Sequence, residues 1–110
     1  MVKIKRMENK FIYKSTGQYL GFVQNNSLYS RDGFYLGWVE GNFVWDVDGK
    51  FRGVIRDANN QHYILLNRFA LSPVQRPPRP QLPSVVPLIP PNAFVTPITL
   101  PVGYIDGFNL

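Results

Sequence analysis

Apolar and polar positions along the first 69 residues follow the two-residue period of β-strands, and one short pattern is repeated. Tyr19 to Val23 reads YLGFV, and it recurs sixteen residues later as YLGWV and again, altered, as FRGVI. Self-similarity at a fixed period predicts one structural unit repeated around an axis or along a stack. Simple alternation places Tyr19, Gly21 and Val23 on one face of the strand. Leu20 and Phe22 then lie on the other face, so both faces carry apolar groups and both are expected to be covered.

Turn signals separate the strands at the same spacing. Asp32-Gly33 and Asp48-Gly49 lie between units, while Asn25-Asn26 and Gly41-Asn42 lie within them. Pairs of this kind supply the positive φ angles that tight hairpin turns require. Each sixteen-residue unit is therefore predicted to be a β-hairpin.

The sixteen-residue frame extends to both sides of the clear repeats. Upstream it predicts a strand at 3–7 followed by one at 8–13, and downstream it pairs 51–55 with 62–66 across a longer loop at 57–61. The prediction is an all-β fold of four sequential β-hairpin repeats with period 16 and pseudo-four-fold symmetry. We expect the hairpins to close into a ring, because closure removes the exposed strand edges of a short meander.

Composition changes sharply near residue 70. All ten prolines lie between residues 73 and 101, and no charged residue occurs from 80 to 105. The chain therefore divides into a hairpin-repeat domain, residues 1–69, and an extended proline-rich C-terminal arm, residues 70–110. The prolines exclude an uninterrupted helix and hence a transmembrane span, and they favour polyproline II structure.

The arm is too apolar for a solvated linker, so we expect it to lie against protein. The side chains expected to pack on the hairpins, within the chain or across a subunit interface, are Val86, Leu88, Ile89, Phe94 and Val95. Packing across an interface would make the arm a means of self-association. Pro77, Pro80 and Pro83 also have the spacing of a ligand for an aromatic groove of the SH3 kind. Self-packing is the favoured use of this segment.

The repeats and the arm together resemble a known family. YLG- and FxG-type hairpin repeats with Asp-Gly turns, followed by a proline-rich apolar tail from Pro73 to Pro101, are similar to the small bacterial proteins called 4-fold β-flower proteins. The resemblance covers most of the chain, although the first unit lacks the mid-strand glycine. It implies the repeat architecture, and it carries over no functional residue.

The chain has a net charge of +5, from twelve Lys and Arg against seven Asp and Glu. A basic balance favours polyanionic partners, although a solvated basic surface is the commoner meaning of so small an excess. Lys50, Arg52 and Arg56 alternate along one predicted strand and are expected to share a face. With Lys10 and Lys14 they form the predicted polyanion site, where rings would stack on the bases of single-stranded nucleic acid and cations would contact its phosphates.

No catalytic, cofactor or metal site is predicted. The chain has no Cys, and its single histidine, His62, lies beside a predicted loop. Asp46 and Asp48 share one side of a strand, yet Asp48 is a turn residue before Gly49. Ser30, His62 and Asp46 could be written down as a triad, but triads are defined by geometry and the spacing supports none.

These observations predict a non-catalytic binding or assembly module rather than an enzyme. The alternative is a polyanion or single-stranded nucleic-acid binder that uses the basic strand. A cytoplasmic location is expected, because the chain has no cysteine and its first residues carry charge without the apolar run of a signal peptide.

Overall fold

Every regular element between residues 9 and 110, the part of the chain that the computed structural model describes, is a β-strand. The strands are β1 (Lys10–Tyr13), β2 (Tyr19–Gln24), β3 (Ser27–Ser30), β4 (Tyr35–Glu40), β5 (Phe43–Asp46), β6 (Phe51–Ala58), β7 (Gln61–Asn67) and β8 (Tyr104–Asp106). They form one sheet in which each strand pairs antiparallel with the next. The predicted all-β class is confirmed.

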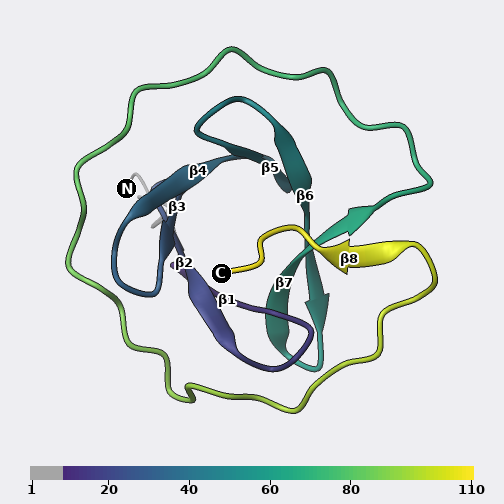
Figure 1. Cartoon of the computed structure of the whole chain (residues 1–110). Helices are drawn as coiled ribbons and strands as arrows, with labels where there is room; N and C mark the ends of the chain where they lie inside the picture. The colour runs from purple at the N-terminus through teal and green to yellow at the C-terminus, as the bar shows by residue number, and fades with distance from the viewer. Residues whose placement is uncertain (1–8) are drawn as a thin grey trace, which may run out of the picture.

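The sheet closes into a barrel through β1 and β7 (Figure 1). Seven antiparallel strands in succession leave the first and the last running the same way, so the closing pair is parallel, with Ile12 opposite His62 and Tyr13 opposite Tyr63. β8, which was not predicted, pairs with β7 outside the closed ring. The predicted strand at 3–7 lies outside the described residues, so the hairpins of the described chain are β2–β3, β4–β5 and β6–β7.

Asparagine pairs form two of the hairpin turns. Asn25 and Asn26 have φ angles of 52° and 61° between β2 and β3, and Asn59 and Asn60 have angles of 50° and 64° between β6 and β7. Positive φ at both central residues is the geometry that matches the twist of the flanking strands. The predicted loop at 57–61 is therefore wrong, because β6 and β7 stay paired up to this two-residue turn.

One bulge is repeated around the barrel. The strand register shifts at three equivalent places, between Ile12 and Tyr13, between Leu28 and Tyr29, and between Val44 and Trp45. The extra residues on the partner strands are Leu20, Leu36 and Arg52. A one-residue bulge turns the side chains that follow it to the opposite face. The predicted alternation over 19–23 is therefore wrong: Leu20 and Val23 lie in the inner cluster, while Tyr19 and Phe22 lie in the outer one.

The inside of the barrel is filled by aliphatic side chains and one aromatic ring. Ile12, Leu28, Val44 and Ile64 are at most 2% exposed. Phe108 packs in the same cluster, and the C-terminus lies at the centre of the barrel in the axial view (Figure 1). A barrel of this size has room inside only for side chains. The segment after β8 therefore closes one end of it.

The outside of the barrel carries stacked aromatic pairs. Phe22 stacks on its cross-strand neighbour Tyr29 with ring centres 5.4 Å apart, and Trp38 stacks on Trp45 at 6.3 Å. All four rings are buried. Since a single layer of sheet cannot cover its own outer face, another segment must lie over these rings.

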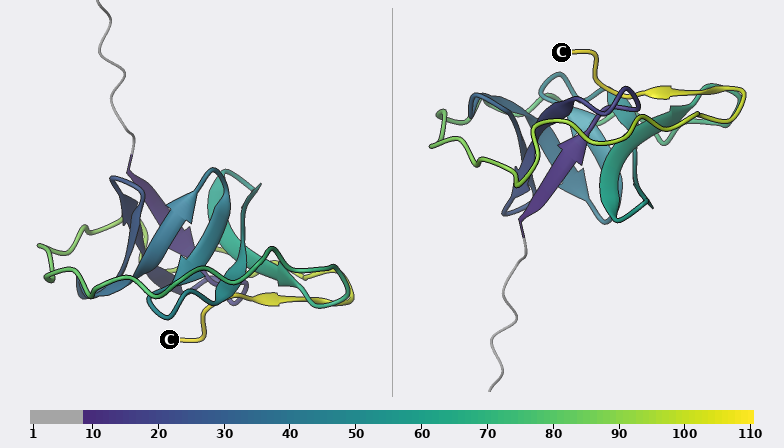
Figure 2. Two further views of the ribbon diagram at one scale, coloured as in Figure 1. Left: turned by 90° about the horizontal axis from the view of Figure 1, so that it is seen from above. Right: turned by 90° about the horizontal axis from the view of Figure 1, so that it is seen from below.

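That segment is the arm. Residues 70–103, which we call the belt, encircle the barrel near the end where the C-terminus lies (Figures 1 and 2). The belt meets the turns at 46–49, 30–33 and 14–17, in the reverse of their order in the chain. At each turn a glycine carbonyl accepts a belt N–H: Arg76 donates to Gly49 at 2.8 Å, Val85 to Gly33 at 2.9 Å and Val95 to Gly17 at 2.8 Å.

Belt side chains that face the barrel recur every third residue, which is the period of polyproline II. Val85 and Leu88, and then Val95 and Ile98, pack in the outer cluster, and Leu100 joins it two residues after Ile98, where the period ends. The predicted packing of Leu88 and Val95 is thus confirmed, and it occurs within the chain. The prediction was wrong for Val86, Ile89 and Phe94, which are 84%, 88% and 72% exposed because they fall at the other positions of this period.

The turn glycines have no room for a side chain. Gly17, Gly33 and Gly49 have φ angles of 92°, 88° and 82°, which other residues rarely adopt. A Cβ atom on these glycines would collide with the belt carbonyls of Val95, Val85 and Arg76, respectively. The belt therefore lies directly on the backbone of each turn.

We expect Gly33→Ala to destabilise the protein far more than Gly41→Ala. Both glycines have positive φ, 88° and 63°, so both substitutions carry a backbone cost of roughly 1–2 kcal/mol. A Cβ at Gly41 meets no atom within 4 Å, whereas one at Gly33 meets the Val85 carbonyl. Urea unfolding should show the excess cost, and the Val85 amide should exchange faster with solvent in Gly33→Ala. Equal losses of unfolding free energy in Gly33→Ala and Gly41→Ala would show that the belt contact at Gly33 does not add to stability.

Two tyrosine hydroxyls also bind the belt. Tyr13 donates to the Asn92 carbonyl at 2.6 Å, and Tyr19 donates to the Leu88 carbonyl at 3.0 Å. Burial, and to a lesser extent the neighbouring Tyr13, raises the pKa of Tyr19 to about 12. Because this folded-state pKa lies above the ordinary value of 10.0, the folded protein holds the phenol proton more tightly than the unfolded chain does.

The resulting stabilisation should be complete below about pH 10 and should be lost as the pH rises from about 10 to 12. Tyr19→Phe removes the titrating group, so its stability should fall less steeply across this range than that of the unsubstituted protein. Urea midpoints measured at intervals from about pH 9 to 12 test this expectation. Parallel pH profiles for the two proteins would refute it.

Candidate functional site

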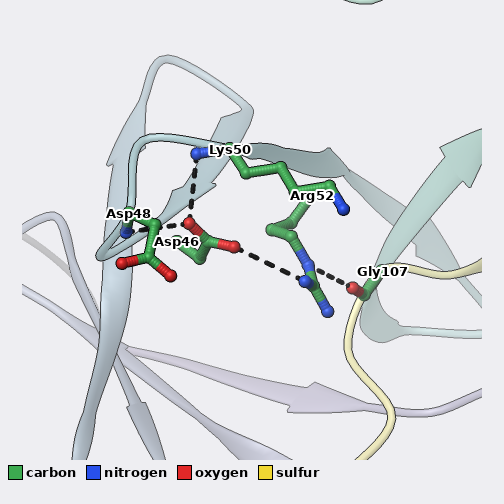
Figure 3. Close-up of polar contacts among 5 residues, drawn as sticks. All are labelled: Asp46, Asp48, Lys50, Arg52 and Gly107. Carbon is green, nitrogen blue, oxygen red and sulfur yellow. Dashed lines mark hydrogen bonds and ion pairs between the residues drawn. The ribbon is translucent and has the colours of Figure 1, made fainter. Parts of the chain in front are cut away.

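Arg52, the basic residue at the third bulge, holds the C-terminal segment in place (Figure 3). Its Nε donates to the Gly107 carbonyl at 2.8 Å, and its guanidinium lies 4.6 Å from the centre of the Phe108 ring. Its Nη1 lies 3.4 Å from Oδ2 of Asp46, whose Oδ1 accepts two backbone N–H groups of the following turn. Arg52 thus anchors Gly107 and Phe108, which belong to the segment that closes one end of the barrel.

The basic strand does not present one face. The bulge directs Arg52 toward the barrel mouth, whereas Arg56 lies opposite Tyr63, a member of the outer cluster. The shared face predicted for Lys50, Arg52 and Arg56 is therefore wrong. A bulge cannot be read from alternation within a single strand, since it depends on the register of the neighbouring strand.

The remaining predicted cations are dispersed. Lys10 begins β1, and Lys14 follows its other end. The Nζ of Lys14 donates to the Leu110 carbonyl at 2.8 Å, so this lysine also contacts the C-terminal segment. Lys50 is exposed just before β6. The structure thus gathers Lys14 and Arg52 around residues 107–110 and leaves Lys10, Lys50 and Arg56 apart.

The residues considered for catalysis have separate partners. Ser30 accepts the Phe34 N–H at 3.2 Å, Asp46 contacts Arg52, and His62 Nδ1 lies 2.5 Å from Asp57 Oδ1. Ser30, Asp46 and His62 are therefore not joined in one site. Between residues 9 and 110, no group of three or more His, Cys, Asp or Glu side chains is arranged to hold a metal ion. The described chain also has no helix that is long and apolar enough to cross a membrane.

The belt covers the β4–β5 hairpin with two arginines. The guanidinium of Arg79 lies 4.1 Å from the centre of the Trp38 ring, and that of Arg76 lies 5.0 Å from that of Trp45. Both arginines bind the carboxylate of Glu40, at 3.2 and 2.8 Å. The self-packing favoured for this segment is confirmed.

The β6–β7 hairpin lacks the stacked pair of the other two hairpins. Val54 lies opposite Leu65, in the place where Phe22 faces Tyr29 and Trp38 faces Trp45. Two aliphatic side chains thus replace two rings. The replacement falls in the quadrant where the belt begins and ends, beside β7 and β8 (Figure 1).

Two cavities lie beside this hairpin, and together we name them the β6–β7 hollow. The larger has a volume of about 600 Å³ and lies between the end of β6 and belt residues 97–101. The smaller, of about 220 Å³, is bounded by Phe43, Phe51, Val54 and belt residues 70–73. Arg56, Leu65 and Tyr104 line both cavities.

The hollow was not predicted, although one of its two aliphatic residues interrupts the sequence repeat visibly. Val54 stands sixteen residues after Trp38 and thirty-two after Phe22, so the loss of a ring at this position could have been noticed. Leu65 follows Trp45 by twenty residues, outside the sixteen-residue frame. Only the strand register identifies it as the partner of Val54.

Comparison with known proteins bears on the fold. A family model described as "4-fold beta flower protein" matches residues 4–106. The match confirms the resemblance carried by the repeats and the proline-rich tail. No curated protein and no solved structure matches the chain.

Arg52→Leu, which restores the residue found in the other units, should loosen the C-terminal segment. The variant loses the charged hydrogen bond to Gly107, an interaction typically worth about 1.5–3 kcal/mol. The urea midpoint should fall, and the Phe108 ring resonances should broaden or shift. Arg56→Leu is the matched control, because Arg56 forms no ion pair with any residue from 9 to 110, and it should change the stability by less than about 0.5 kcal/mol. A similar loss in both variants would show that Arg52 does not anchor this segment.

Proposed function

We propose that this chain, which belongs to the 4-fold β-flower family, is a non-catalytic binding module whose ligand site is the β6–β7 hollow. The proposal depends on one observation. At the position where two hairpins of the barrel carry stacked rings, the third carries Val54 and Leu65, and two cavities lie beside them, both lined by Leu65 and the smaller also by Val54.

The size and lining of the hollow support a binding role. Small-molecule sites typically measure about 300–1,000 Å³. The larger cavity, at about 600 Å³, lies in that range. Its walls combine apolar side chains, Leu65, Ile98 and Leu100 among them, with the polar side chains of Arg56, Asp57, Asn59, Thr99 and Tyr104. Such a lining suits a ligand with an apolar body and a polar group that orients it.

The belt supports assembly as a second candidate. Val86, Ile89 and Phe94 are large apolar side chains that the belt directs away from the barrel. Clusters of exposed apolar side chains are typical of contact surfaces between proteins. These residues would be the contacts in the self-association predicted for the arm.

Polyanion or nucleic-acid binding has less support. Of its five predicted cations, Arg52 and Lys14 contact the C-terminal segment. Of the rings on β6 and its neighbouring strands, Trp45 and Tyr63 are buried and not free to stack on bases, which leaves only Phe43 and Phe51 accessible.

A neutral aromatic probe tests the binding role of the hollow. We expect indole at millimolar concentration to shift the amide resonances of Val54, Leu65 and their neighbours. In Val54→Trp the new ring takes the place that Trp38 has in its own hairpin, so these shifts should disappear. Cavity filling commonly leaves a protein as stable or stabilises it by about 0.5–2 kcal/mol, and thermal melting will show whether the variant is folded.

Val86→Trp is the matched control, since it adds the same ring to an exposed belt position outside the hollow. It should bind indole as the unsubstituted protein does. Absence of localised shifts in the unsubstituted protein, or their persistence in a folded Val54→Trp variant, would refute the proposed site.

A further inference from the structure

The stacked rings of two hairpins indicate what kind of chemical group would fit the hollow beside the third. In two hairpins, cross-strand rings stack with centres 5.4 and 6.3 Å apart. In the third hairpin, the smaller cavity of about 220 Å³ lies beside the equivalent residues, Val54 and Leu65. An apolar cavity of about 150 Å³ suffices to hold benzene. The space therefore fits a planar group of one or two rings.

The walls of this cavity also favour an aromatic ring. Phe43 and Phe51 line it, and their rings meet edge to face with centres 5.8 Å apart. Aromatic rings prefer such tilted or offset contacts, which are worth roughly 0.5–1.5 kcal/mol beyond the area that they bury. A ligand ring in the cavity can extend the aromatic cluster in the same way.

A charge reversal within the repeat indicates the polar part of the ligand. The residue two positions after each outer ring or its replacement is Gln24, Glu40 or Arg56. At Glu40 the belt supplies the opposite charge, through two arginines that also lie over the stacked rings. The β4–β5 hairpin thus combines a stacked aromatic pair with ion pairs between Glu40 and the belt.

At Arg56 the belt supplies no such charge. Residues 70–103 contain no Asp or Glu, and Arg56 forms no ion pair with any residue from 9 to 110. The one acidic residue lining either cavity is Asp57, which contacts His62. Arg56 lines both cavities and is exposed. It therefore has its donors available to an anion beside the apolar space.

We propose that the ligand of the β6–β7 hollow is a small aromatic carboxylate. Its ring lies against Val54, Leu65 and Phe51, and its carboxylate accepts hydrogen bonds from Arg56, a planar donor that suits two-point contact with such a group. The ligand then takes the place of the missing ring pair and supplies the counter-charge that the belt provides at Glu40. This inference rests on the proposed binding function of the same hollow.

Indole and indole-3-acetate separate the ring from the charge. Titration calorimetry at low salt should show the carboxylate binding about tenfold or more tightly than indole, as a charge-assisted contact at a partly exposed site allows. Arg56→Gln should remove this preference and leave the affinity for indole unchanged. Val54→Trp should abolish the binding of both compounds, and acetate alone should bind to none of the proteins.

The outcomes distinguish the two proposals. Equal affinity for the two compounds, or a preference that persists in Arg56→Gln, would overturn the carboxylate assignment while the hollow remained a binding site. Failure of both compounds to bind the unsubstituted protein would overturn both proposals. Lys50→Gln serves as the matched charge control, because Lys50 is an exposed cation just before β6 that does not line the hollow, and it should keep the full preference.

Discussion

The structure depends on the coverage of a sheet that is apolar on both faces. Closure of the barrel buries the inner face, but the outer rings stay in contact with water unless a second layer is laid over them. The belt forms this layer, and it is fixed by backbone hydrogen bonds to the carbonyls of Gly17, Gly33 and Gly49. Because these bonds involve no side chain, an inward-facing belt position can hold arginine over tryptophan at one turn and valine or leucine over tyrosine at another.

The same arrangement explains why one quadrant differs from the rest. The belt must begin and end somewhere, and it does so beside β7, where β8 returns toward the barrel. No continuous stretch of belt can lie across this quadrant as it does elsewhere. Val54 and Leu65 stand here in place of the stacked rings, and the β6–β7 hollow lies beside them. The departure from symmetry and the candidate site thus have one origin.

Features with a local cause could be predicted from the sequence, and those set by distant partners could not. Asn and Gly pairs imposed the turns, and the repeated YLG pattern indicated the hairpins and the family. The side-chain faces of 19–23 were assigned wrongly, because the bulge at Leu20 arises from pairing with β1. The three-residue period of the belt follows from its own proline-rich sequence. Which of its three faces meets the barrel depends instead on contacts with the distant turns. β8, the burial of Phe108 and the role of Arg52 involve residues more than thirty-five positions apart, and no short pattern reports them.

The pairing of β7 with β8 has a topological consequence. It joins the two ends of the belt, so that residues 70–103 form a loop closed by strand pairing, and the barrel passes through that loop (Figure 1). The chain cannot unwrap by peeling from one end while this pairing holds, because the encircling segment is tied at both ends. Unfolding must first break the tie or draw the barrel out of the loop. A high kinetic barrier, rather than a large equilibrium free energy, can then set the lifetime of the native state.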